Sequence, residues 1–131
     1  DTIDCIATDH APHTLKEKSA ATPPPGVPGL ETSLPLMLTA VSRDRLTLER
    51  VIELMSDNPR QIYNLPDQSD THVEIDLTPY TIRNADMKTK CGWTPFDGMQ
   101  AAGRVKRVIL RGKTVYENGR ILAKTGDGLV I

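Results

Sequence analysis

The sequence lacks the features that mark membrane proteins and nucleic-acid-binding proteins. No apolar run approaches the roughly 20 residues of a transmembrane helix, and no basic-then-apolar leader precedes the first apolar segment. Its 16 Lys and Arg are balanced by 17 Asp and Glu, for a formal charge of −1, and the basic residues form no cluster. We therefore expect a soluble protein whose partners include neither a membrane nor a nucleic acid.

Cysteine is scarce as well. The 131 residues contain only Cys5 and Cys91, and no CxxC spacing joins them. A disulfide framework is therefore not expected, which favours a reducing, cytoplasmic setting. Cys5 lies in an apolar segment, where we expect it to pack as a small hydrophobic residue.

An initial methionine is also missing, and the chain opens directly on a segment with the composition of a core strand. Residues 5–8, Cys-Ile-Ala-Thr, are uncharged and fit a strand covered on both faces, as in parallel sheets. Such a strand needs neighbours that 131 residues can hardly supply, because an α/β barrel usually takes about 250 residues. We therefore expect the chain to be incomplete alone, with most of a barrel upstream or on another chain.

An acid and two imidazoles follow this predicted strand, where positions 9–13 read Asp-His-Ala-Pro-His. Residues just past the strands of an α/β barrel face the substrate, so Asp9 is the first catalytic candidate. His13 can reach the same pocket, and three roles stay open for it: metal ligand, ligand of an anionic substrate group, or structural residue. His10 should point away from Asp9 in an extended chain, and we expect it to support the structure.

Residues 14–29 form a long loop that is rich in proline. Three consecutive prolines at 23–25 favour an extended course and remove three backbone donors. Loops of this length inside compact domains are usually functional or disordered. The loop is either a stiff surface connector or part of the site, and its position after Asp9 favours the second interpretation.

Helical periodicity follows the loop. Apolar residues at helical spacing predict a helix over residues 30–41, with Glu31 in its first turn, and a second helix over residues 47–55 capped by Thr47. The second helix should bury one apolar stripe, which consists of Leu48, Val51, Ile52 and Met55.

A third, short helix is predicted after these two. Asn58 and Pro59 form a cap followed by a proline at the first helical position, which opens a helix as far as Tyr63.

From residue 71 the apolar period changes to two, which predicts a half-exposed strand over residues 72–77. Further strands are expected at 105–110, 113–117 and 120–123, joined by tight turns at Arg111-Gly112 and Asn118-Gly119. His72 should lie on the surface of the first of these strands. Between the strands, residues 93–98 contain the only Trp and the only Phe of the chain, and we interpret this segment as a structural clasp.

The strings at 7–18 and 23–32 closely resemble the dihydroorotases, especially those inside the multifunctional pyrimidine-synthesis polypeptide of animals and fungi. Hydantoinases and allantoinases share the Asp-His pair but not typically the Ala-Pro-His that follows. The resemblance implies an α/β fold: the C-terminal portion of a TIM-like (β/α)8 barrel over residues 1–70, with its last strand, substrate loop and closing helices, and then strands of a small flanking β-sandwich over residues 71–131.

The implied activity is the reversible cyclisation of N-carbamoyl-L-aspartate to L-dihydroorotate in de novo pyrimidine biosynthesis. This chemistry needs an activated water, a polarised carbonyl and a proton shuttle; two zinc ions can supply the first two and a carboxylate the third. By resemblance, Asp9 is both a metal ligand and the proton shuttle, while His13, Pro25 and Gly26 contact the substrate. The other family ligands are absent from this sequence, so we expect the fragment alone to be inactive.

The resemblance also implies partners: the N-terminal remainder of the same domain, carbamoyl-phosphate synthetase and aspartate transcarbamoylase domains, and further copies in a homo-oligomer. Two alternative functions remain. The chain could belong to an inactive dihydroorotase-like scaffold domain of a fused pyrimidine-synthesis protein, against which the retention of Asp9 and His13 argues. It could also belong to another cyclic-amide hydrolase, of the hydantoinase or dihydropyrimidinase kind.

Overall fold

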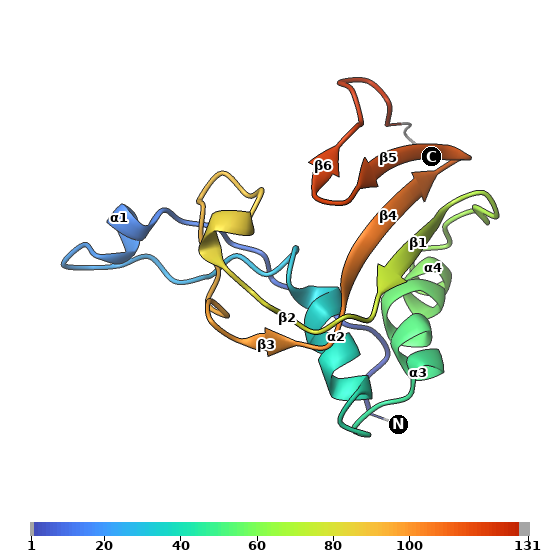
Figure 1. The fold of residues 1–131 in the computed structure, drawn as a ribbon, viewed down its shortest axis with the longest axis horizontal. Coiled ribbons are helices and arrows are strands. Elements are labelled where there is room, and N and C mark those ends of the chain that lie inside the picture. The colour runs from blue at the N-terminus through green and yellow to red at the C-terminus, as the bar shows by residue number, and fades with distance from the viewer. Residues whose placement is uncertain (1, 129–131) are drawn as a thin grey trace.

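The structure is a computed structural model that describes residues 2–128, with helices in the first half of the chain and strands in the second (Figure 1). The helices are α1 (Leu15–Lys18), α2 (Ser33–Val41), α3 (Leu48–Ile52), the π-helical turn η1 (Glu53–Asp57), α4 (Asn58–Ile62) and the 3-10 turn η2 (Asn84–Asp86). The strands are β1 (His72–Asp76), β2 (Tyr80–Thr81), β3 (Gln100–Ala101), β4 (Arg104–Leu110), β5 (Lys113–Glu117) and β6 (Arg120–Ile121). No helix in the described range has the length and apolarity that crossing a membrane requires.

The first predicted helix starts three residues later than expected. Its prediction began at Leu30, but residues 30–32 form turns and α2 begins at Ser33. Pro35 is therefore the third residue of the helix, within the first turn, where no backbone hydrogen bond to the preceding turn is lost. Glu31 consequently lies outside the helix and does not interact with its first turn as predicted.

The second and third predicted helices are one continuous helix. Thr47 caps it as predicted, because its hydroxyl accepts the N–H of Arg50 at 3.1 Å. The prediction that Asn58 starts a new helix is wrong: α3, η1 and α4 follow one another with helical backbone angles throughout. The side chain of Asn58 instead donates to the carbonyl oxygen of Asp4 at 2.7 Å.

The apolar stripe of this helix is buried only in part. Val51 is buried as predicted, but Leu48 and Ile52 are 40% and 49% exposed in this chain. Leu54, which lies in the π turn, is buried at 5% exposure. Leu54 lies three residues after Val51 and shares its face of the helix, a position that the predicted stripe did not include.

The predicted strand at residues 5–8 is absent from the described structure. Its residues form no ladder, and the segment lies instead along the helix. Ile6 donates its N–H to the Leu54 carbonyl at 3.0 Å, and the Arg50 guanidinium donates to the Ile3 carbonyl at 2.9 Å. A strand covered on both faces needs neighbouring strands, which the described residues do not place beside this segment.

The predicted strands of the second half are confirmed. β1, β4, β5 and β6 form one antiparallel sheet in that order, and β2 and β3 form a second pair. Both predicted tight turns have positive φ at their two central residues: 49° and 72° at Arg111-Gly112, 46° and 83° at Asn118-Gly119. Arg107 on β4 bridges Glu74 on β1 and Glu117 on β5, which ties three strands together.

Helix α2 joins the helical half to the strands. Leu38 of α2 is buried against Gly103, where a Cβ atom would lie 3.0 Å from the leucine Cδ1. Thr39 is also buried, and its hydroxyl accepts the N–H of Ala102 at 3.0 Å. The other buried apolar side chains are Val51, Leu54, Ile82, Trp93 and Ala101. Because α2 contacts both β3 and β4, it fixes the end of the preceding loop relative to the sheets.

Candidate functional site

Asp9 stands at a sharp bend of the backbone. Its φ of 45° lies in the left-handed region, which aspartate tolerates better than most residues with a side chain, and the residue is exposed. The bend separates the segment that lies along the helix from the segment that enters the loop. Asp9 is therefore presented at the point where the chain leaves the helices, as expected of a residue at the rim of a site.

His10 holds this bend against the start of α2. Its Nδ1 accepts the N–H of Gly29 at 3.0 Å and that of Leu30 at 3.4 Å, so in the neutral ring the proton is on Nε2. Gly29 also packs on the backbone here, since a Cβ atom on it would meet the Thr8 carbonyl oxygen at 3.2 Å. The predicted supporting role of His10 is confirmed by these contacts.

The two ends of the proline-rich loop lie side by side. Ala11 donates its N–H to the Val27 carbonyl at 3.2 Å. Gly26 has a φ of 97°, and a Cβ atom there would lie 2.5 Å from the Ala11 Cβ, so glycine is required both by conformation and by space. The fold thus brings Pro25 and Gly26 next to the segment that carries Asp9 and His13.

The side chain of Lys18 on α1 links this helix to the end of the loop. Its ammonium group donates to the carbonyl oxygens of Pro24 at 2.7 Å and Gly26 at 3.1 Å. One side chain thus provides a hydrogen-bond donor to two carbonyl oxygens of the loop. In Figure 1 this loop, with α1 on it, projects from the body of the chain.

His13 lies where the loop begins, directly before the capping box of α1. Its side chain is one-third exposed, and its Nδ1 lies 3.9 Å from the Glu17 carboxylate. The N–H and the hydroxyl of Thr14 both donate to Glu17, at 2.7 and 2.8 Å. These hydrogen bonds, with a smaller contribution from the charge of His13, lower the pKa of Glu17 below its usual value. Glu17 is thus an ionised partner that faces the imidazole.

The described residues form no metal site by themselves. Among them no group of three His, Cys, Asp or Glu side chains is close enough to hold a metal ion. Catalytic zinc usually takes three protein ligands, so Asp9 and His13 with their neighbours do not complete a zinc site within this part of the chain.

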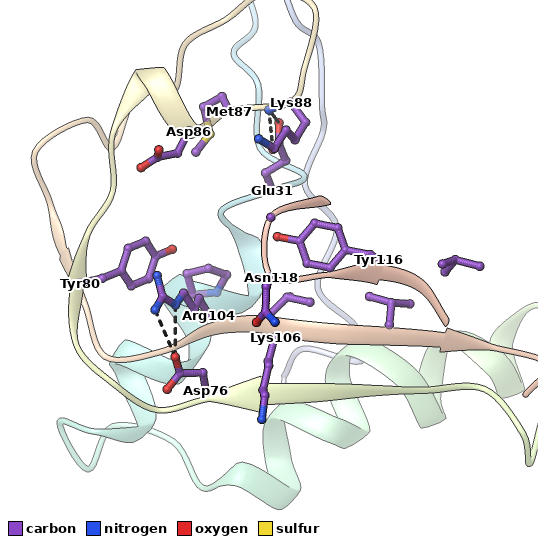
Figure 2. Close-up of a pocket in the computed structure, with 15 residues that line it drawn as sticks. Glu31, Asp76, Tyr80, Asp86, Met87, Lys88, Arg104, Lys106, Tyr116 and Asn118 are labelled. Atoms are coloured by element: carbon purple, nitrogen blue, oxygen red, sulfur yellow. Dashed lines mark hydrogen bonds and ion pairs between the residues drawn. The ribbon is translucent and has the colours of Figure 1, made fainter. Parts of the chain in front are cut away.

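A cleft lies elsewhere in the described part of the chain. It has a volume of about 590 Å³ and opens between the four-stranded sheet and the segment around Met87 (Figure 2). In Figure 2 the Arg104 guanidinium, 5.5 Å from the centre of the Tyr80 ring, is bonded to the Asp76 carboxylate. Burial raises the pKa of Tyr80 above its usual value, against the opposing effect of the Arg104 charge. None of the predicted site residues lines this cleft.

Two contacts between the loop and residues 84–97 were not predicted. The indole N–H of Trp93 donates to the His13 carbonyl oxygen at 2.6 Å, and the Glu31 carboxylate accepts the backbone N–H groups of Lys88 and Thr89 at 2.8 and 2.7 Å. Trp93 is therefore a clasp, as expected, and its partner is His13, the residue before the N-cap of α1. The scarcity of tryptophan singles this side chain out in the sequence, whereas nothing there indicates which residue it contacts.

The chain is similar in sequence to known proteins. No protein-family model matches the sequence. The chain is 54% identical over 130 residues to the multifunctional protein pyr1-3 of Dictyostelium discoideum, covering 98% of this chain and 6% of that protein. It is 39% identical over 131 residues to a dihydroorotase of Pyrococcus furiosus, covering 95% of this chain and 31% of that enzyme. The chain is similar in sequence to a part of this dihydroorotase. It spans less than a third of each of these relatives.

Solved structures also match this chain. The L-hydantoinase of Arthrobacter aurescens matches it with a TM-score of 0.85 and 30% identity, over 93% of this chain and 30% of that one. The inactive dihydroorotase-like domain of the Chaetomium thermophilum CAD-like multifunctional protein matches with a TM-score of 0.62 and 33% identity, over 72% of this chain and 27% of that one. The mixed helix and sheet arrangement is thus shared with a hydantoinase and with a dihydroorotase-like domain described as inactive.

Proposed function

We propose that this chain forms part of a zinc-dependent dihydroorotase, which interconverts N-carbamoyl-L-aspartate and L-dihydroorotate in pyrimidine biosynthesis. The supporting observation is the pairing of the segment that carries Asp9 and His13 with the returning Pro25-Gly26 segment, through the Ala11 to Val27 hydrogen bond and the close packing of Gly26. In this proposal residues 1–70 contribute the last strand, substrate loop and closing helices of a barrel, and residues 71–131 contribute to a flanking β-sandwich. The strand at residues 5–8 would form only beside strands that lie outside this chain.

Asp9 is assigned the proton transfer. In the hydrolytic direction a water oxygen bonds to the amide carbon, and the Asp9 carboxylate accepts the proton that this water loses. When the carbon–nitrogen bond breaks, Asp9 returns the proton to the departing nitrogen, so that the carboxylate is regenerated. Its exposed position at the backbone bend leaves the side chain accessible to a substrate.

His13, Pro25 and Gly26 are assigned to the substrate. An imidazole can donate to the carboxylate that both dihydroorotate and carbamoyl aspartate carry. Gly26 allows the main chain to approach a ligand closely, and Lys18 holds that main chain in place by bonding the carbonyl oxygens of Pro24 and Gly26. This arrangement favours the binding of an anionic substrate beside His13, where the loop begins.

Zinc is assigned to a site that this chain completes only in part. An aspartate oxygen is a ligand that zinc accepts, but the described residues do not bring three ligands together. We therefore assign Asp9 as one ligand of two zinc ions whose other ligands lie outside this chain. Bound zinc would polarise the carbonyl and make the attacking water more acidic.

The proposed partners are the N-terminal remainder of the domain, neighbouring carbamoyl-phosphate synthetase and aspartate transcarbamoylase domains, and other copies in a homo-oligomer in the cytoplasm. The identity of 54% to a protein named as multifunctional supports the neighbouring domains.

Two further functions are candidates. The similarity to a domain described as inactive supports a scaffold role, and the TM-score of 0.85 to an L-hydantoinase supports action on another cyclic amide. Turnover and metal content separate the three: a dihydroorotase binds zinc and acts on dihydroorotate, a scaffold does neither, and a hydantoinase-type enzyme opens hydantoin.

The direct experiment uses the whole polypeptide that contains this chain. Its zinc content is measured, together with turnover of dihydroorotate, carbamoyl aspartate and hydantoin. Asp9→Asn should lower kcat for dihydroorotate by a factor of about 10² to 10⁴. His72→Ala, at an exposed position on β1, serves as the control and should leave kcat unchanged. Full turnover by Asp9→Asn would show that the proton shuttle is wrongly assigned.

A further inference from the structure

We propose that Trp93 is a positioning residue for His13, which makes the affinity for an anionic substrate depend on residues 84–97. This inference rests on the proposed function, in which His13 binds the substrate carboxylate. It adds a residue from the strand-rich half of the chain that touches neither substrate nor metal.

The contact between the two residues is short, partly buried and long-range. Trp93 is 8% exposed, and its indole N–H lies 2.6 Å from the His13 carbonyl oxygen, 80 residues away in sequence. An indole has a single donor and no acceptor, so this bond fixes both the position and the direction of one peptide group. That peptide group belongs to the residue whose imidazole is assigned to the substrate.

The segment that carries Trp93 is itself held firmly. The N–H of Thr94 donates to the Asn84 side-chain oxygen at 2.8 Å, and the N–H of Asn84 donates to the Asp97 carboxylate at 2.7 Å. These two bonds close residues 84–97 into a compact unit that includes η2. Trp93 therefore projects from a fixed support and not from a loose loop.

A second anchor joins this unit to the other end of the loop. Glu31, just before α2, accepts the backbone N–H groups of Lys88 and Thr89, and Figure 2 shows Glu31 turned toward Lys88. The same unit thus contacts the loop at His13, where it begins, and at Glu31, where it ends. In Figure 1 residues 84–97, in yellow and orange, lie beside the blue segment that leads to α1.

On its other side His13 is restrained by α1. Thr14 caps the helix through the reciprocal bonds with Glu17, and Glu17 also faces the imidazole at 3.9 Å. The backbone of His13 is therefore fixed between a helix cap and the Trp93 indole. Removal of the indole N–H releases one of these two restraints.

Asp9 is held by a different contact. The bend at Asp9 is fixed by His10, which accepts the N–H groups of Gly29 and Leu30, and Trp93 takes no part in those bonds. Loss of the Trp93 bond should therefore weaken substrate binding and leave the proton transfer intact. This separation of KM from kcat distinguishes a positioning role from general loss of structure.

The test uses the whole polypeptide that contains this chain, with dihydroorotate as the anionic ligand and dihydrouracil as the uncharged one. Two variants remove the donor: Trp93→Phe, and replacement of Trp93 by benzothienylalanine, which keeps the ring shape and substitutes sulfur for the N–H group. Each should raise KM and Kd for dihydroorotate by about 3- to 10-fold, the range of one net hydrogen bond. kcat should change by less than about twofold, and Kd for dihydrouracil should stay the same.

Thr39→Val is the matched control, because it deletes the hydrogen bonds of another buried side chain, from the N–H of Ala102 and to the carbonyl oxygen of Pro35, in α2 and outside the loop. It should lower the melting temperature without changing the affinity for dihydroorotate. Equal weakening of both ligands, or an unchanged Kd in the benzothienylalanine protein, would overturn the inference.

The His13→Ala variant separates this inference from the proposed function. If it weakens dihydroorotate binding while the Trp93 variants do not, the proposed role of His13 is supported and the inference about Trp93 is overturned. If the unsubstituted protein neither binds nor turns over dihydroorotate, the proposed function fails, and the inference fails with it.

Discussion

The imidazole of His10 and the backbone of Gly29 are joined by a hydrogen bond of 3.0 Å, which links the bend at Asp9 to the start of α2. One side chain thereby sets the relation between a catalytic candidate and the helix that packs on the sheets. The chemistry proposed for the loop depends on a bond made by a residue that takes no part in that chemistry.

Substitution of His10 tests this link. His10→Ala leaves the N–H groups of Gly29 and Leu30 without their partner and should cost about 1–3 kcal/mol of stability. His10→Asn places a side-chain oxygen near the position of Nδ1 and should recover part of that loss. Denaturant midpoints measure both effects, with exposed His72→Ala as the control. Equal stability of the alanine and asparagine variants would argue against the acceptor role.

Substitution of Gly26 tests the close packing between the end of the loop and Ala11. Gly26→Ala combines a positive φ with a contact of 2.5 Å to the Ala11 Cβ. Gly126→Ala is a matched control, because Gly126 has a similar φ of 91° and nothing within 4 Å of the added atom. Both variants should lose about 1 kcal/mol from the backbone, and Gly26→Ala should lose about 1–3 kcal/mol more from crowding. Similar melting temperatures for the two variants would contradict the close packing of Gly26 against Ala11.

The Thr14 contacts predict the acid dependence of Glu17. Its pKa is held below the usual 4.5, chiefly by the Thr14 backbone and hydroxyl. A carboxylate with a lowered pKa in the fold stabilises it above the unfolded pKa, and this stabilisation is lost as pH falls through the folded pKa. Thr14→Ala should move the Glu17 pKa upward in an NMR titration of the carboxyl carbon, and Thr71→Ala, on another part of the chain, should not move it.

Two buried threonines should respond in opposite ways to the same change. Thr32 is 2% exposed, and within the described structure its hydroxyl has no hydrogen-bond partner, whereas the Thr39 hydroxyl donates to Pro35 and accepts from Ala102. Thr32→Val should therefore be neutral or stabilising, while Thr39→Val should cost about 1–3 kcal/mol. Thermal denaturation of both variants checks this contrast. A large loss in Thr32→Val would indicate a partner for its hydroxyl.

The sequence predicted best where local chemistry decides the conformation. Asn118-Gly119 accepts the positive φ that a tight hairpin needs, and the hydroxyl of Thr47 caps the helix that follows it. These features depend on neighbours in sequence, so their residue types are sufficient to locate them.

Prediction failed where distant residues decide. Asn58 and Pro59 have the local form of a helix start, yet the helix runs through them and Asn58 binds the backbone of Asp4. Residues 5–8 have the composition of a buried strand, but in the described chain they lie along a helix and have no strand beside them. The bond from Trp93 to His13 spans 80 residues, and no periodicity encodes such a contact.

The order β1-β4-β5-β6 makes β1 and β6 the edge strands of the larger sheet in the described structure. The unpaired backbone donors and acceptors of an edge strand can pair with a strand of another polypeptide. Val73 on β1 and Ile121 on β6, which are 48% and 64% exposed, add apolar surface at both places. We therefore expect the isolated chain of 131 residues to self-associate under conditions in which it is still folded.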